Sequence, residues 1–339
     1  MRKATLADIA QHARVDVSTA SRVLRGDSGQ RVSQETRARI LASAEALEYV
    51  PNMLARGLKN ARSYTVGITI PQLDNPVFYD AIQGAAAALK NRGYSLVINY
   101  VNPSEKDENL YKKLVQRRMV DGLLVSGFDT GEDLEKELDE LGFPHVTLNR
   151  DVPGARFSVS HDNQSAAMIA VDHLLELGHR RIVHLAGHQG GVNAMARLAG
   201  YRRALERAGV AYDESLVELA GYTAAGGATA MKRVLERVSP RPTAIFAATL
   251  MSAAGALQVM HEKGIAIPGE MSVISLHDAP FASLVYPPMT TVALANEEMG
   301  RAAAELLLEV IEGSHNVPRR IILPPVCLTR RASTAAAKA

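Results

Sequence analysis

From Tyr64 onward, short apolar runs alternate with amphipathic helical patterns, and this alternation restricts the fold more than any other feature of the chain. The runs are nearly continuous in Val, Ile and Leu, which is typical of strands buried on both faces of a parallel sheet. Strands joined by helices specify doubly wound α/β units. The predicted strands are 65–70, 95–100, 122–126, 145–148, 181–186, 216–220, 244–248, 271–276 and 290–293, and the clearest helices are 77–91, 163–177, 194–208 and 225–238.

The α/β part is too long for a single core. It spans about 270 residues, so we predict two doubly wound lobes with a ligand in the crevice at the carboxyl ends of their strands. The apolar run 321–328 is interpreted as a further buried strand, and its Cys327 as a core thiol. A single cysteine cannot form an internal disulfide or a Cys-rich metal site. The tail 333–339, made of small residues, is expected to be disordered.

The first 60 residues show short helices separated by polar breaks and no strand pattern. Thr5, Asp16 and Ser33 stand where N-caps are expected, ahead of predicted helices 6–12, 17–24 and 34–47. Apolar residues at helical spacing predict a small three-helix core, made of Ile9, Ala10, Ala13, Ala20, Val23, Leu24, Ile40, Leu41, Ala44 and Leu47. A fourth segment, 53–59, is short and carries Gly57, so we expect it to be marginal as an isolated helix.

The first two helices and their tight turn have the layout of a helix-turn-helix. Small polar groups and Arg22 occupy the outer face of the second helix, so it can lie close in the major groove, where Arg22 can pair with guanine and Ser18 and Thr19 can reach bases or phosphates. The distribution of charge along the chain also favours DNA binding by the first 62 residues. Residues 1–62 hold 11 Lys and Arg against 6 Asp and Glu, a net charge of +5. The rest of the chain holds 27 Lys and Arg against 30 Asp and Glu, a net charge of −3. A basic head on a mildly acidic body is expected when one end of a chain meets a polyanion.

Three blocks of sequence carry a resemblance to a known family. They are the head from Thr5 to Leu24, the segment 49–59 (YVPNMLARGLK), and core phrases such as 177–182 (LGHRRI) and 287–292 (PPMTTV). In these blocks and their order the chain resembles the LacI/GalR (lactose-repressor) family of bacterial transcription regulators over nearly its whole length. The resemblance implies a head at 1–49, a hinge helix and linker at 50–62, a two-lobed effector-binding and dimerisation core at 63–332 that is like a periplasmic binding protein, and the tail at 333–339.

The resemblance also implies a set of DNA contacts. Val17, Ser18 and Arg22 hold positions that usually read bases, and Leu58 matches the apolar wedge that paired hinge helices push into the minor groove, lined by Asn52, Ala55 and Lys59. The full predicted DNA-binding set also contains Thr5, Leu6, Thr19, Ser21 and Ser33. Two residues depart from the family pattern: Arg14 replaces a turn glycine, and Asp16 replaces a serine cap. A left-handed conformation at Arg14 would be slightly strained.

For the core, the resemblance implies an effector clamped between the lobes. The implied effector-binding residues are Asp74, Phe78, Tyr79, Ser126, Asn149, Arg150, Arg197, Tyr222, Thr249 and His277. Thr249-Leu250 stands where the family commonly has Asn-Asp, and His277-Asp278 where it has an Asp pair, while Arg150 and Arg197 remain. This leaves a more cationic cleft and favours a sugar acid or another small acid. The alternative, that these arginines pair with Asp151 or Asp278, carries equal weight.

Other function classes fit the sequence less well. No run reaches the roughly 18 apolar residues of a membrane helix, and the start of the chain leads into polar sequence, so we expect a cytoplasmic, nucleoid-associated protein without a membrane. Phosphate-binding and nucleophile-elbow motifs are absent, and His179, His184 and His188 lack spaced partners for a metal, so we expect no catalytic residues, cofactor or metal. The prediction is a homodimeric repressor that binds double-stranded operator DNA and a sugar or sugar-acid effector. The alternatives are a sugar-metabolising enzyme with a helical head, or a transport protein.

Overall fold

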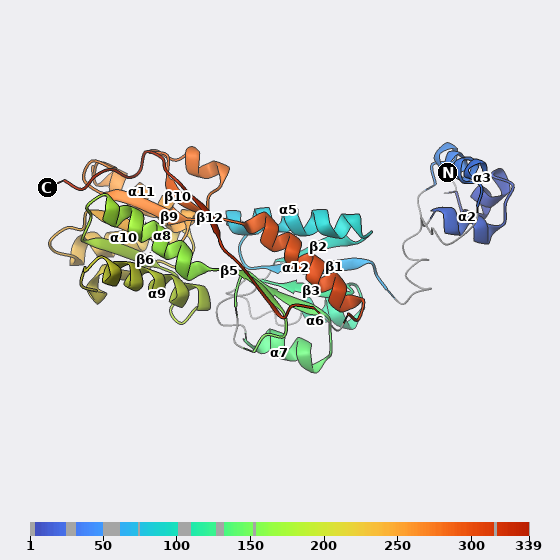
Figure 1. Ribbon diagram of the computed structural model, residues 1–339, viewed down its shortest axis with the longest axis horizontal. Helices are drawn as coiled ribbons and strands as arrows, with labels where there is room; N and C mark the ends of the chain where they lie inside the picture. Colours follow the sequence, from blue (N-terminus) through green and yellow to red (C-terminus); the bar gives the residue numbers. More distant parts are fainter. Residues whose placement is uncertain are drawn as a thin grey trace. The chain divides into compact units, whose positions relative to one another are not determined.

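The computed structural model describes residues 4–24, 32–49, 62–73, 75–100, 110–126, 132–151, 154–314 and 317–338. The chain divides into two compact units, residues 1–63 and 64–339, and each is described by itself. Figure 1 shows the first unit as a group of short helices and the second as two α/β lobes. None of the helices in the described ranges is long and apolar enough to cross a membrane.

The head contains α1 (Leu6–His12), α2 (Val17–Leu24) and α3 (Gln34–Ala46), close to the predicted bounds. Thr5 caps α1 in a reciprocal capping box with Asp8, and the Ser33 side chain caps α3. Six of the predicted core residues are fully buried together: Ile9, Ala10, Ala13, Ala20, Val23 and Ile40. Leu41 is an exception. It is 50% exposed because it lies on the outer face of α3.

The turn between α1 and α2 adopts the predicted left-handed conformation, with φ of 53° at Arg14. Two contacts hold this turn: the Val15 amide donates to the Ala10 carbonyl, and the Arg39 guanidinium donates to the Ala13 carbonyl at 2.8 Å. They offset the strain of a side chain in the left-handed region. The predicted segment 53–59 lies outside the described residues.

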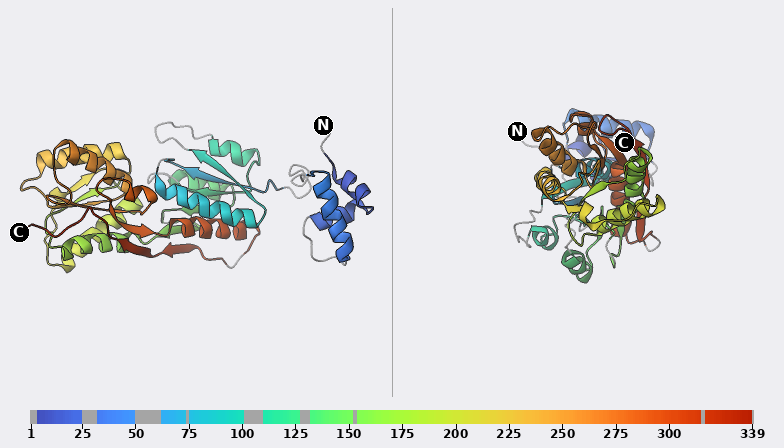
Figure 2. Two further views of the ribbon diagram at one scale, coloured as in Figure 1. Left: turned by 90° about the horizontal axis from the view of Figure 1, so that it is seen from above. Right: turned by 90° about the vertical axis from the view of Figure 1, so that its left-hand side faces the viewer.

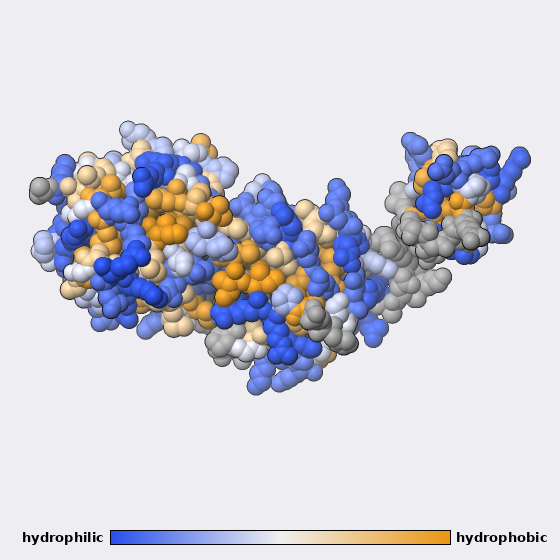
Figure 3. Space-filling view, viewed as in Figure 1, coloured by the Kyte–Doolittle hydropathy of each residue, from blue (hydrophilic) through white to orange (hydrophobic). Residues whose placement is uncertain are grey.

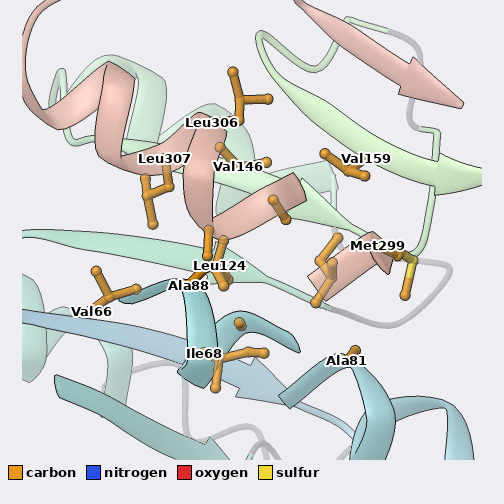
Figure 4. Close-up of a cluster of buried hydrophobic side chains, with 14 of the residues drawn as sticks. Val66, Ile68, Ala81, Ala88, Leu124, Val146, Val159, Met299, Leu306 and Leu307 are labelled. Atoms are coloured by element: carbon orange, nitrogen blue, oxygen red, sulfur yellow. The ribbon is translucent and has the colours of Figure 1, made fainter. Parts of the chain in front are cut away.

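Lobe 1 is built on an all-parallel sheet in the order β11-β5-β4-β3-β1-β2. Its strands are β1 (Thr65–Ile70), β2 (Ser95–Tyr100), β3 (Gly122–Val125), β4 (His145–Leu148), β5 (Ser158–His161) and β11 (Arg320–Leu323). Helices α5 (Pro76–Asn91) and α12 (Asn296–Ile311) pack on one face and on each other, and α6 (Leu110–Gln116) and α7 (Glu132–Glu140) cover the other (Figures 1 and 2). Figure 4 shows side chains of α12, among them Leu306 and Leu307, in one buried cluster with sheet residues such as Leu124 and Val146.

Lobe 2 repeats this architecture, with strand order β12-β10-β9-β8-β6-β7. Its strands are β6 (Ile182–Ala186), β7 (Val217–Leu219), β8 (Ala244–Ala247), β9 (Ser272–Leu276), β10 (Thr290–Leu294) and the antiparallel edge strand β12 (Pro325–Thr329). One face packs against α8 (Asn163–Glu176) and α9 (Val192–Arg207), and the other against α10 (Ala224–Arg237) and α11 (Leu250–Glu262). Short 3₁₀ turns lie at Glu214–Leu216 and Pro280–Ser283. The predicted two-lobed α/β class is confirmed.

The chain passes between the lobes three times: from β5 to α8, from β10 to α12, and from β11 to β12. The last passage corrects the interpretation of 321–328 as one strand. Pro324 divides the run, so that β11 joins the sheet of lobe 1 and β12 that of lobe 2. The prediction of Cys327 as a core thiol is also wrong, because Cys327 lies exposed on an edge strand.

The expected disorder of the C-terminal tail is wrong for residues 333–337, which are bound to lobe 2. Ser333 is fully buried, and its hydroxyl donates to the Val273 carbonyl while accepting the Thr290 amide. Further along, Ala335 exchanges hydrogen bonds with Ser272 and accepts one from His179, and the Ala337 amide donates to Leu177. The small side chains that suggested low complexity allow the tail to lie close against lobe 2.

Candidate functional site

The outer face of α2 is polar and open, whereas its inner face is packed into the head. Val17 is 47% exposed and Ser18 is exposed, while Ala20 and Val23 are buried. The Arg22 side chain runs back along the helix, and its Nε donates to the Ser18 carbonyl at 3.2 Å. Because only Nε is used in this bond, the terminal nitrogens of the guanidinium keep their donors for a bidentate contact with a base edge.

Two of the other predicted DNA contacts also act as helix caps. The Thr5 hydroxyl bonds to Asp8, and the Ser33 hydroxyl donates to Thr36 Oγ1 at 2.9 Å. Both residues are exposed at helix N-termini, where backbone amides favour a phosphate. Leu6, Thr19 and Ser21 are half-buried. The hinge residues Asn52, Ala55, Leu58 and Lys59 lie outside the described residues, as does Asp74 of the effector set.

The α/β unit contains a cavity of about 560 Å³ between its lobes, at the carboxyl ends of both sheets. Lobe 1 contributes the segments after β1, β3 and β4 together with the start of α5. Lobe 2 contributes the segments after β6, β7, β8 and β9 together with the start of α9. The lining residues are Pro71, Gln72, Asn75, Val77, Phe78, Ser126, Leu148, Asn149, Arg150, His188, Gln189, Asn193, Arg197, Tyr222, Thr223, Thr249 and His277.

Arg197 is the most constrained polar residue in this wall. It is 2% exposed, and its guanidinium bonds to three groups: Asn163 Oδ1 at 2.8 Å, the Ala248 carbonyl at 2.9 Å and His277 Nε2 at 3.2 Å. The Tyr222 ring adds a cation–π contact, with 5.8 Å between Arg197 Cζ and the ring centroid. A buried charge held in this way is preorganised, because it loses little side-chain entropy when a ligand arrives.

His277 is neutral in this environment. Burial lowers the pKa of its imidazole well below the usual range, and the Arg197 charge lowers it further. Because arginine has no acceptor, Arg197 donates to His277 Nε2, and the ring proton of His277 sits on Nδ1. Arg150 and Arg197 therefore supply the positive charge of the described cavity wall, and the neutral imidazole of His277 does not add to it.

The ends of β4 and β9 are strained at matching points of the two lobes. Asn149 has φ of 62° and His277 has φ of 70°, both in the left-handed region that favours glycine. Such strain outside glycine persists where the surroundings enforce it, and it gathers at ligand sites. Across the cavity, the Asn193 side chain of lobe 2 donates to the Asn149 carbonyl of lobe 1 at 2.7 Å. This bond joins the two lobes at the ligand cavity itself.

His188 and Tyr222 form an aromatic corner. Their rings meet edge to face, with 4.9 Å between the ring centroids. The Tyr222 ring packs on Gly187, where any Cβ would come within 2.4 Å of it. The fold thus needs glycine at 187 in order to place this ring. Apolar ring faces in a polar wall suit the C–H face of a sugar.

The two aspartates considered as partners for the cleft arginines form ion pairs with other residues. Asp151 pairs with Arg320, and Asp278 pairs with Arg331 at 2.9 Å. Arg150 is 3% exposed and lines the cavity together with Arg197. Among the described lining residues there is no carboxylate.

The structure brings eight of the ten predicted effector residues to one cavity: Phe78, Ser126, Asn149, Arg150, Arg197, Tyr222, Thr249 and His277. Tyr79 is not among the lining residues. It is 61% exposed, because it follows Phe78 by one step around α5 and so faces away. Sequence reasoning missed Asn193 and the neighbouring Asn163, although a pair of asparagines at the starts of two helices is a signal for capping or ligand contacts.

Comparison with known proteins agrees with this geometry. Residues 5–52 match the model of bacterial regulatory proteins of the lacI family, and residues 171–334 match the periplasmic binding protein-like domain. The transcriptional regulator CelR of Thermobifida fusca is 34% identical over 97% of this chain and 98% of its own length. The repressor CytR of Escherichia coli is 32% identical over 92% of this chain and 91% of its own.

The chain belongs to the LacI family of bacterial transcriptional regulators. Among solved structures, the Lac repressor dimer bound to operator and the anti-inducer ONPF matches with a TM-score of 0.79 and 26% identity, over 99% of this chain and all of that one. The CelR–cellobiose complex matches with a TM-score of 0.75 and 33% identity, over 97% and 99%. As a LacI-family regulator, the chain has a DNA-binding head and a periplasmic-binding-protein-like core, as its sequence predicted.

Proposed function

We propose that this LacI-family chain is a homodimeric repressor whose affinity for operator DNA is set by a small ligand bound between its lobes. The observation that carries the proposal is the cavity, because it lies at the carboxyl ends of both sheets and is walled by residues of both lobes. A ligand that contacts both walls binds one degree of lobe closure better than another. By linkage it then shifts the equilibrium between DNA-binding and non-binding states.

In this proposal α2 is the recognition helix. Val17, Ser18 and Arg22 read bases, and Thr5, Leu6, Thr19, Ser21 and Ser33 position the head on the backbone. The exposed outer face of α2 supports these roles, as do the terminal nitrogens of Arg22, which form no hydrogen bond with the described residues. Leu58 is the proposed minor-groove wedge, lined by Asn52, Ala55 and Lys59.

A homodimer is supported by exposed apolar side chains on both lobes. In β2, the edge of lobe 1, Val97, Ile98 and Tyr100 are 41%, 47% and 46% exposed, so both faces of this strand carry open apolar surface. Lobe 2 exposes Leu284 and Tyr286 at 80% and 81%. Hydrophobic residues also gather in patches on the face of each lobe seen in Figure 3. An apolar edge strand and exposed apolar loop residues of this kind are expected to be covered by a second copy.

The ligand we propose is a sugar or sugar acid, with an acid preferred. The cavity is roomy enough for a sugar, the aromatic corner suits a ring face, and two buried guanidiniums suit a carboxylate. The solved relatives hold neutral sugars: one is a CelR–cellobiose complex, and another LacI-family regulator, from Enterococcus faecium, holds ribose. Neither of these two ligands is an acid.

Two measurements test the proposal. Selection of bound DNA from a random pool, with and without a metabolite panel, is expected to yield a near-palindromic site whose recovery depends on one metabolite. Calorimetry against matched pairs, such as D-glucose with D-glucuronate and D-galactose with D-galacturonate, is expected to favour the acids. Recovery of no preferred sequence would reject the operator role, and tight binding of neutral sugars alone would reject the acid preference.

A further inference from the structure

A line of polar side chains runs from the helices of lobe 1 to Arg197 through two of the lobe crossovers. Asn296, the first residue of α12, accepts a hydrogen bond at its Oδ1 from His161 Nε2, with 3.0 Å between the two atoms. His161 is the last residue of β5, and a single residue separates it from the start of α8. Asn163, which holds Arg197, also donates to the His161 carbonyl at 3.2 Å. His161 therefore lies between Asn296 of lobe 1 and the residue that positions Arg197.

The hydrogen-bond partners fix the protons of this line. The Asn296 Oδ1 is an amide oxygen and can only accept, so His161 Nε2 carries the proton and donates it to this oxygen. Burial lowers the pKa of His161 to about 4, so the ring is neutral at pH 7 and its Nδ1 carries only a lone pair. His277 has the opposite tautomer, because its Nε2 accepts from Arg197 and its proton sits on Nδ1.

The two remaining ring nitrogens are complementary. His161 Nδ1 is a buried acceptor and His277 Nδ1 a buried donor, and neither has a hydrogen-bond partner within the described part of the chain. The two rings interact electrostatically, and both are influenced by the Arg197 charge on α9. On the lobe 1 side, Asp80 and Glu297 are the charged groups next to Asn296. Because the two nitrogens do not bond to each other directly, a buried donor and acceptor of this kind gain most when one water joins them.

We propose that His161 is a positioning residue of the ligand cavity: paired with His277 through one water, it holds the Arg197 guanidinium and ties it to Asn296 of lobe 1. The pairing makes the position of Arg197 depend on how the lobes meet. Ligand binding at Arg197 is thereby linked to the packing of α5 and α12. The link to ligand binding rests on the proposed function of the cavity. The contacts that position Arg197 do not depend on that function.

The test uses the full-length protein, ¹⁵N-labelled, with His161→Phe as the variant and His184→Phe as the matched control. His184 is equally buried, also has a pKa near 4, and stacks between Tyr201 and Phe246 without a hydrogen bond to Arg197. Nitrogen NMR reports the tautomer of each histidine and the solvent exchange of Arg197 Nε–H. His161→Gln, which keeps a donor for Asn296 but lacks the Nδ1 acceptor, serves if the phenylalanine variant does not fold.

The wild type is expected to show Nε2–H at His161, Nδ1–H at His277 and a slowly exchanging Arg197 Nε–H. His161→Phe or His161→Gln should speed that exchange by about tenfold, the effect of losing one buried hydrogen bond, whereas His184→Phe should change it by less than about twofold. Reversed tautomers, or equal exchange in the His161 variants and the wild type, would overturn the proposal.

Ligand binding gives a second readout, with D-glucuronate and cellobiose as probes. The His161 variants are expected to weaken whichever probe binds by about tenfold relative to His184→Phe. Equal weakening in variant and control would mean that His161 has only a structural role, and would also overturn the proposal. If neither probe binds the wild type, the sugar assignment loses support, while the exchange measurement still decides the role of His161.

Discussion

Arg197 and Arg22 illustrate two ways in which a single residue carries function in this protein. Arg197 is buried, bonded to three groups and fixed before any ligand arrives. Arg22 lies at the surface, with one bond to its own helix. The sequence predicts both arginines, because charged residues at these positions match a family pattern. It does not predict Asn163 or His161, because their roles come from the lobe crossovers and not from any local pattern.

At the residue scale, Arg22→Ala is expected to weaken operator binding by about 1–3 kcal/mol and to relax base preference, because a bidentate contact to a base edge is lost. Fluorescence anisotropy with the selected operator and with random DNA of equal length measures both effects. An equal loss on the two DNAs would show that Arg22 contacts phosphate and reads no base.

The buried histidines give the protein an expected loss of stability in acid. Burial lowers the pKa of His161 and of His184 to about 4, below the unfolded value of 6.5. Above pH 6.5 both states are neutral; as pH falls from 6.5 towards 4, only the unfolded chain takes up protons, so the free energy of unfolding decreases, by up to about 3 kcal/mol for each histidine. Urea unfolding between pH 7.5 and 4.5 measures this slope, which should be shallower in His184→Phe. Equal slopes in the two proteins would contradict the role of His184.

At the scale of elements, the lobes depend on helices that touch through glycine. A Cβ at Gly300 of α12 would lie 1.9 Å from the Ala81 carbonyl oxygen of α5, and one at Gly84 of α5 would lie 1.9 Å from the Glu297 carbonyl oxygen of α12. The two helices therefore cross with their backbones in contact. Gly300→Ala is expected to destabilise the protein by about 1–3 kcal/mol, since the helices must separate. Gly269→Ala, where the nearest atom lies at 3.4 Å, is the control, and chemical unfolding is the measurement. Equal stability of the two variants would count against this contact.

The C-terminal tail is the element in which sequence and structure differ most. Deletion of residues 333–339 is expected to cost several times the roughly 1 kcal/mol of one hydrogen bond, because Ser333, Ala335 and Ala337 all bond to lobe 2. Deletion of residues 338–339 alone serves as the control and should leave the unfolding midpoint nearly unchanged. A midpoint equally unaffected by the longer deletion would show that the tail contributes little.

Elements were predictable where one physical signal dominated. The strands β1, β2 and β4 have their predicted bounds because apolar side chains fill them. β5 was missed because its sequence, Ser-Val-Ser-His, is polar, although all four residues are buried. Its polar groups are needed at the crossover, where His161 bonds to Asn296. The tail and the division of 321–328 between two sheets were missed because both depend on long-range contacts.

At the scale of the whole molecule, the division of charge corresponds to a division of roles. The head carries the excess of +5 and the exposed polar face of α2, and the lobes, with −3, enclose the cavity. Two halves of one regulator are useful only if they are coupled. Linkage requires that a ligand which changes operator affinity by some factor has its own affinity changed by operator through the same factor.

The most direct test is therefore to measure both affinities on one preparation of the full-length protein. Operator affinity is titrated with and without the sugar or sugar acid that calorimetry selects, and ligand affinity is titrated with and without operator. The account predicts a change of at least about fivefold, equal in the two experiments. A ligand that binds the cavity but leaves operator affinity unchanged would contradict it.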